Sequence, residues 1–156
     1  MVISGLILKR KDNSDIQRLI RDITLAAERA NLKPRIKENF YQSRDGGVYT
    51  TGNIANTYED IPEAEQWLMY LYSDDDCTDR FDWIAQGAKL IRVMIIEDIS
   101  DCERILLDFL YEYLKLNPED YFYDEEEWYY THEDIVRIKQ REFDPTWCYK
   151  NPHLEL

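Results

Sequence analysis

The chain has 156 residues, of which 44% are hydrophobic, and a formal net charge of −13. This length and composition predict one globular domain, residues 1–156, and exclude a disordered or low-complexity protein. The charge disfavours nucleic acid and anionic membranes as partners and favours a basic protein, although acidic surfaces also keep proteins soluble without any partner.

The charge is unevenly distributed along the chain. Residues 1–44 carry a net charge of +5, whereas residues 45–156 carry −18. Three cysteines, an odd number without close pairing, predict reduced thiols rather than a disulfide framework. The first residues place their charges after a short apolar run, unlike a secretory signal, and no apolar stretch approaches the roughly 20 residues of a membrane helix. We therefore expect a cytoplasmic protein.

The first part of the chain predicts a strand followed by a helix. Residues 2–10 are apolar and read as a strand. Residues 13–31 have apolar side chains at helical spacing, and Asp12, Asn13 or Ser14 would cap this helix.

A hairpin is predicted next. The glycines Gly46 and Gly47 lie between residues 35–43 and residues 48–51, as turn glycines lie between paired strands. Residues 51–58 read as a loop.

The middle of the chain, residues 61–88, allows two interpretations. Residues 60–63 have the form of a helix start, with an N-cap, an early proline and a box glutamate. Residues 67–72 nevertheless have the composition of a strand. We favour a short turn followed by a strand, and an all-helical middle is the alternative.

The second half predicts a buried strand and two helices. Residues 89–97 are dense in branched side chains. A capping box of Ser100 and Glu103 opens a helix at about 100–116, and a threonine cap opens a short C-terminal helix at about 131–141. The fold class is therefore α+β: one domain with a mostly antiparallel sheet packed against helices at about 13–31 and 100–116. Three aromatic residues should attach the tail to the body: Phe143, Trp147 and Tyr149.

No motif for catalysis or for a cofactor stands out. Asp74 and Asp76 superficially match a phosphatase-type D-x-D-x-T signature, which leaves a small metal-dependent hydrolase as an alternative function. A calcium loop fails, because Asp79 and Ala85 stand where it needs glycine and glutamate. The two histidines are twenty-one residues apart, which is not a zinc-site spacing. We expect no enzymatic activity, no metal and no cofactor.

The strongest candidate for a binding surface is an acidic and aromatic ribbon at residues 121–130. Aromatic side chains supply binding energy, and neighbouring carboxylates steer a basic partner. The alternative is that the aromatic rings belong to the core and the acidic residues form a solvated loop. The candidate contact residues are Asp124, Glu125, Glu126, Glu127, Trp128, Tyr129 and Tyr130, with Asp74, Asp75 and Asp76 as a second acidic patch.

Three segments of the second half carry a family resemblance: LIRVMII, FLYEYLKLNPEDYFYDEEEWYYTHEDI and FDPTWCYKNP. In these segments the chain resembles the small immunity proteins of bacterial polymorphic toxin and contact-dependent inhibition systems. The resemblance implies a cytosolic antitoxin that binds a cognate toxin domain, encoded beside it, and occludes its active site. Many such toxins are nucleases with basic sites. The resemblance transfers no functional residue, and a generic regulatory adaptor would differ only in its partner.

Overall fold

The structure, a computed structural model, describes residues 3–42, 47–73, 81–85, 87–124 and 128–154, in which a long run of strands separates the first two α-helices. The strands are β1 (Gly5–Arg10), β2 (Lys33–Ile36), β3 (Tyr41–Gln42), β4 (Val48–Ala55), β5 (Gln66–Tyr72), β6 (Leu90–Ile96), β7 (Tyr121–Asp124) and β8 (Tyr129–Tyr130). The α-helices are α1 (Ile16–Arg29), α2 (Glu103–Leu116) and α3 (His132–Gln140). Three 3-10 turns are η1 (Lys11–Asn13), η3 (Trp147–Tyr149) and η4 (Pro152–Leu154).

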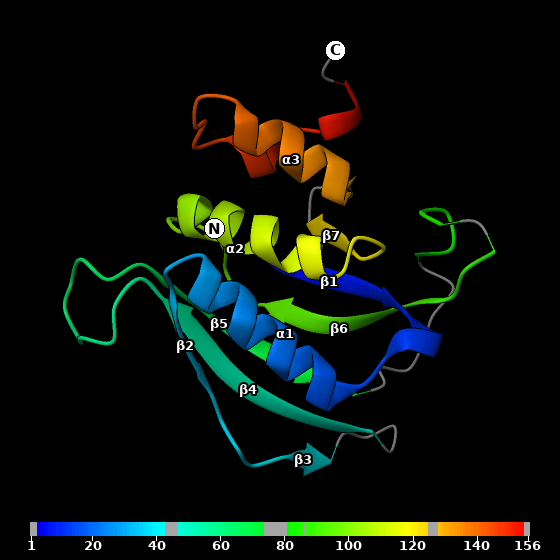
Figure 1. Cartoon of the computed structure of the whole chain (residues 1–156), viewed down its shortest axis with the longest axis horizontal. Coiled ribbons are helices and arrows are strands. Elements are labelled where there is room, and N and C mark those ends of the chain that lie inside the picture. The colour runs from blue at the N-terminus through cyan, green and yellow to red at the C-terminus, as the bar shows by residue number, and fades with distance from the viewer. Residues whose placement is uncertain (1–2, 43–46, 74–80, 86, 125–127, 155–156) are drawn as a thin grey trace.

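The eight strands form one antiparallel sheet in the order β2-β4-β5-β6-β1-β7-β8, with β3 paired to β4. Helices α1 and α2 pack against each other on one face of this sheet, and α3 packs against α2 (Figure 1). The N-terminal strand β1 therefore lies inside the sheet, between β6 and β7.

The predicted α+β fold is confirmed, including its two long helices and its short C-terminal helix. The middle of the chain follows the favoured interpretation, because residues 66–72 form strand β5. Helix α1 is capped by Asp15, one residue beyond the predicted candidates: its Oδ1 accepts the Gln17 N–H at 3.0 Å. Thr131 caps α3 in a capping box with Asp134.

The predicted loop at residues 51–58 is wrong, because strand β4 continues to Ala55. Gly52 lies at the centre of this strand, opposite Ile36 of β2 and Met69 of β5. A Cβ atom at Gly52 would lie 2.6 Å from the carbonyl oxygen of Arg35. Glycine, a poor strand former, is therefore required here for β2 to approach β4.

The capping box predicted at Ser100 is also wrong, because α2 begins at Glu103. The Ser100 N–H donates to Oδ1 of Asp98 at 3.0 Å, and Asp101 has a φ of 65°. That left-handed backbone places Ser100 outside the helix. Cys102 is the N-cap residue, and its side chain makes no cap hydrogen bond.

The main core lies between the sheet and the helices, and it includes residues of the C-terminal segment. Trp147 is 4% exposed, and Phe143 and Tyr149 pack against the same core, as the sequence predicts for the tail. A second, smaller cluster lies on the opposite face of the sheet and comprises Leu6, Leu8, Phe81, Leu90 and Tyr123. Strands β1 and β6 therefore contribute buried residues on both faces of the sheet.

Candidate functional site

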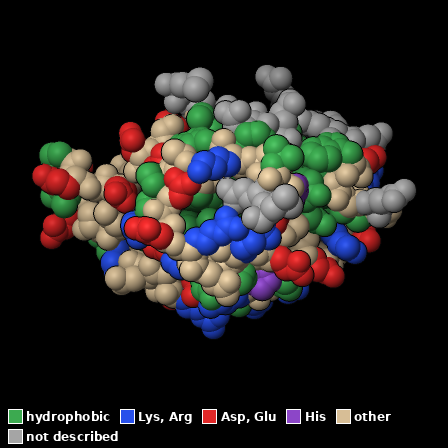
Figure 2. Space-filling model, turned by 90° about the horizontal axis from the view of Figure 1, so that it is seen from above, with side chains coloured by type: hydrophobic (Ala, Val, Ile, Leu, Met, Phe, Trp, Pro, Cys, Tyr) green, Lys and Arg blue, Asp and Glu red, His purple; other side chains and the backbone are tan. Residues whose placement is uncertain are grey.

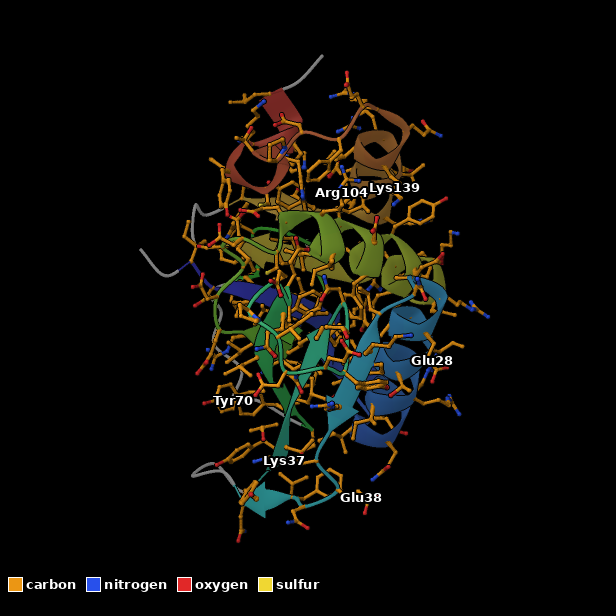
Figure 3. The ribbon with its side chains drawn as sticks, turned by 90° about the vertical axis from the view of Figure 1, so that its left-hand side faces the viewer. Glu28, Lys37, Glu38, Tyr70, Arg104 and Lys139 are labelled. Carbon is orange, nitrogen blue, oxygen red and sulfur yellow. The ribbon has the colours of Figure 1, made fainter. Side chains whose placement is uncertain are left out.

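Strands β4 and β5 expose one face of the sheet. In β5 the alternate residues Trp67, Met69 and Leu71 are buried in the main core, so the residues between them lie on the opposite face. Figure 3 shows α1 on one side of the sheet and Tyr70 on the other. The residues of this opposite face pair directly across the two strands: Tyr49 with Tyr72, Thr51 with Tyr70, and Asn53 with Leu68. We call these six residues, with Arg35 and Lys37 of the neighbouring β2 segment, the open face.

Residues 81–85 cover the other half of the same side of the sheet. The Phe81 ring meets the Tyr123 ring edge-on at 5.4 Å, and the Trp83 ring lies 5.6 Å from that of Tyr129. Over β4 and β5, by contrast, Leu68 is 53% exposed. Of the described segments, none therefore buries the open face.

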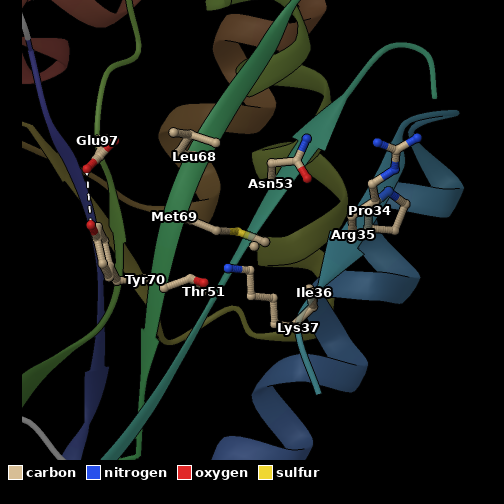
Figure 4. Close-up of a pocket in the computed structure, with 11 residues that line it drawn as sticks. Pro34, Arg35, Ile36, Lys37, Thr51, Asn53, Leu68, Met69, Tyr70 and Glu97 are labelled. Atoms are coloured by element: carbon tan, nitrogen blue, oxygen red, sulfur yellow. Dashed lines mark hydrogen bonds between the residues drawn. The ribbon is translucent and has the colours of Figure 1, made fainter. Parts of the chain in front are cut away.

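A groove of about 810 Å³ lies on the open face (Figure 4). The side chain of Lys37 extends into it from the side of β2, and Thr51, Leu68 and Tyr70 line it. No carboxylate of the described residues pairs with the Lys37 ammonium. The groove thus offers a cation, hydrogen-bonding groups and an exposed leucine side by side.

One side of the groove is closed by a hydrogen bond between β5 and the end of β6. The Tyr70 hydroxyl donates to Oε1 of Glu97 at 3.2 Å. The charge of Glu97 raises the pKa of Tyr70 above its ordinary value of 10.0, so the phenol stays neutral at pH 7. These groups suit binding rather than nucleophilic chemistry.

A row of tyrosine rings continues the open face toward β3. The Tyr49 ring lies 5.4 Å from Tyr41, 5.7 Å from Tyr72 and 6.4 Å from Tyr70. Tyr41 is 43% exposed at the edge of the row. Tyrosine presents a large, stiff contact area at low entropic cost, so this row is suited to contact with another protein.

The predicted acidic and aromatic ribbon forms the β7–β8 hairpin at one edge of the sheet. Asp124 and Tyr130 are both 0% exposed, so neither reaches the surface as a contact residue. Trp128 and Tyr129 are half-buried. The other predicted contact residues lie outside the described residues: Glu125, Glu126, Glu127, Asp74, Asp75 and Asp76.

Tyr130 holds the hairpin to the C-terminal segment. Its hydroxyl accepts the Trp128 Nε1–H at 2.9 Å and donates to the carbonyl oxygen of Lys150 at 2.8 Å. The ring centres of Phe122 and Trp147 lie 5.6 Å and 5.4 Å from the centre of the Tyr130 ring. Part of the ribbon is therefore core, as the alternative interpretation held.

A buried polar cluster at the end of α2 was not predicted. The Lys9 ammonium contacts Asp120 at 2.9 Å and Oδ1 of Asn117 at 3.1 Å, and the Tyr113 hydroxyl donates to Asp120 at 2.7 Å. The Asn117 amide donates to Asp22 of α1 at 3.3 Å. Burial raises the pKa of Asp120 despite the charge of Lys9. These groups satisfy one another, so the cluster joins β1, α1 and α2 rather than forming a reactive site.

Within the described ranges, no group of His, Cys, Asp or Glu residues is arranged to hold a metal ion, and no helix is long and apolar enough to cross a membrane. The described residues form an α+β domain whose sheet is uncovered at the open face, over β4 and β5. Comparison of the chain with protein-family models, with curated proteins and with solved structures finds no match.

Proposed function

We propose that the chain is an immunity protein that binds a cognate toxin domain and neutralises it by occluding the active site. The observation that carries this proposal is the open face together with the tyrosine row that continues it. Leu68 and Tyr41 are exposed there, and Tyr49, Tyr70 and Tyr72 are half-buried on the paired strands. A large aromatic and apolar surface on a rigid scaffold is typical of a protein interface. An inhibitor of this kind needs no reactive groups of its own.

The net charge favours a basic partner, such as a nuclease-like toxin domain in the cytoplasm. A nuclease holds phosphates in a basic site, so an acidic protein is attracted to the same site and associates quickly. The open face itself carries Lys37 and Arg35. The attraction must therefore come from carboxylates around this face rather than from the groove.

The proposal predicts that a large secreted protein is encoded beside this chain, and the test uses the C-terminal domain of that protein. Expressed alone in bacteria, that domain should stop growth, and co-expression of the chain should restore it. The purified proteins should form a complex, with toxin activity lost at one equivalent of inhibitor. Toxicity that persists under co-expression, without complex formation, would rule the proposal out.

Two substitutions of exposed leucines test the surface. Leu68→Arg places a charge on the open face, whereas Leu154→Arg changes a residue that is 78% exposed in the C-terminal segment. We expect Leu68→Arg to weaken binding at least tenfold and Leu154→Arg to leave it within twofold. Equal effects would place the interface elsewhere.

A further inference from the structure

A loop between β4 and β5, residues 56–65, projects from the end of the open face (Figure 1, left). Two apolar side chains on it are exposed, Tyr58 at 51% and Ile61 at 39%. Leu68, 53% exposed, lies in the strand that follows. We call these three residues the loop-end patch.

The loop-end patch is continuous with the open face. Leu68 pairs across the strands with Asn53, and Asn53 pairs with Arg35. The Arg35 guanidinium carbon lies 4.9 Å from the centre of the Tyr58 ring. One line of side chains therefore runs from β5 across β4 and β2 to the loop.

The loop is held in place before any partner binds. Nη2 of Arg35 donates to the Tyr58 carbonyl oxygen at 2.6 Å, and the Tyr58 hydroxyl donates to the carbonyl oxygen of Pro34 at 3.4 Å. At its base, the Asn56 N–H donates to the Glu65 carbonyl at 3.0 Å, and the Glu65 N–H returns to Oδ1 of Asn56 at 3.1 Å. A loop fixed in this way loses little conformational entropy on binding.

The surroundings of the loop-end patch are acidic. The loop, residues 56–65, contains four Asp and Glu and no Lys or Arg. All four of these carboxylates are exposed: Glu59, Asp60, Glu63 and Glu65. Figure 2 shows acidic side chains beside hydrophobic ones at the left end of the molecule. Arg35, a cation beside the loop, is engaged by Tyr58.

We infer that the loop-end patch enters the basic cleft of the toxin domain, with Tyr58 and Ile61 in apolar contact and the surrounding carboxylates facing its Lys and Arg. This inference rests on the proposed function. An exposed apolar centre with a charged rim matches the anatomy of interfaces, and charge complementarity selects a basic partner. A second copy of this chain would set like charges against each other.

The experiment compares two variants that change net charge equally. The loop variant combines Glu59→Gln, Asp60→Asn and Glu63→Gln. The control combines Glu28→Gln, Glu119→Gln and Glu142→Gln, three exposed glutamates in other parts of the chain. Association rates with the toxin domain are measured by stopped flow at low and high salt, after circular dichroism confirms folding.

The loop variant should associate about tenfold more slowly than wild type at low salt, with the difference fading at high salt, and the control should stay within about threefold. Ile61→Ala should speed dissociation about tenfold, whereas Leu154→Ala should not.

If both triple variants slow association equally, only net charge matters and the inference fails. Wild-type binding with every loop variant unchanged would overturn the inference alone. No wild-type binding would overturn the proposed function with it, and a loop-dependent dimer of the free chain would identify a second copy as the occupant.

Discussion

The ammonium of Lys9 lies 2.9 Å from Oδ2 of Asp120, and both side chains are more than nine-tenths buried. This ion pair joins β1 to the segment between α2 and β7, two parts of the chain 111 residues apart. Removing one partner leaves the other charge buried alone, which is more costly than never having buried the pair.

Lys9→Met should therefore destabilise the fold strongly. We expect a loss of about 3–5 kcal/mol in the free energy of unfolding, measured by urea titration at pH 7. The matched control is Lys150→Met, which breaks the more exposed Lys150–Asp144 pair and should cost less than about 1 kcal/mol. Equal losses in the two variants would show that Lys9 makes no special contribution.

The same pair predicts a pH dependence. Burial raises the pKa of Asp120 above its ordinary value of 3.8. The folded state therefore binds this proton more tightly than the unfolded state, so this group's contribution to stability falls as pH rises from 3.8 through the folded pKa. Lys9→Met removes the charge that opposes this rise in the pKa of Asp120. The fall of the free energy of unfolding with rising pH should therefore continue to higher pH in Lys9→Met than in wild type. A variant with an unchanged pH profile would contradict this.

Asp134 predicts the opposite pH dependence. Burial alone would raise its pKa, but hydrogen bonds from Thr131 and Arg137 outweigh burial and hold the pKa below 3.8. Its contribution is present above pH 3.8 and is lost as pH falls through the lower, folded pKa. The free energy of unfolding is measured by urea titration at pH 6 and at pH 3. Its decrease from pH 6 to pH 3 should be smaller in Asp134→Asn than in wild type. Equal losses would mean that Asp134 does not govern this range.

Two cysteine thiols should resist modification in the folded protein. Burial raises the pKa of Cys102 and of Cys148 to about 12, so at pH 8 only about one thiol in 10⁴ is ionised. With Cys77→Ser, an aromatic disulfide reagent should react slowly with the folded chain and label two thiols after unfolding. Rapid labelling of the folded chain would contradict the burial of these thiols.

Gly52→Ala should damage the open face without touching its side chains. The added methyl group would lie 2.6 Å from the Arg35 carbonyl oxygen and 3.0 Å from Cα of Ile36, and these backbone atoms cannot move aside by a change of rotamer. We expect a loss of about 1–3 kcal/mol by thermal melting, with β2 displaced from β4. The neighbouring Thr51→Ala, on the open face, should cost less. Similar melting of both variants would show that β2 adjusts freely.

Divalent ions test the alternative hydrolase function. If the chain is a binding protein, millimolar Mg²⁺ or Ca²⁺ should leave its melting temperature unchanged, because no site stabilises the folded state. A rise in melting temperature that disappears in Asp74→Asn with Asp76→Asn would instead support the hydrolase.

Local signals account for most elements that the sequence predicted correctly. Helix α1 follows from apolar spacing and α3 from its threonine cap, while β5 and β6 follow from their branched and aromatic residues. The second half of strand β4 was missed because Gly52 and Asn53 are poor strand formers, and pairing with two neighbours overrides that preference.

The candidate site was harder to predict than the fold. The alternation of Leu68, Tyr70 and Tyr72 is visible in the sequence, but which face the helices leave uncovered depends on packing between distant segments. Asp124 looked like part of an acidic surface, yet its strand is buried. The Lys9–Asp120 pair had no local signal at all.

The position of β1 inside the sheet has a consequence for folding during synthesis. Gly5–Arg10 is made first, but its partners Leu90–Ile96 and Tyr121–Asp124 come much later. At about 5–20 residues per second, roughly 6–25 seconds pass between the synthesis of this strand and that of β7, the later of its two neighbours. Strand β1 can thus pair with β6 first, and it lacks its second neighbour until residue 124 has been made. The edge of the sheet formed by β7 and β8 therefore closes late, and folding should be slow and dependent on protection from aggregation until β7 emerges.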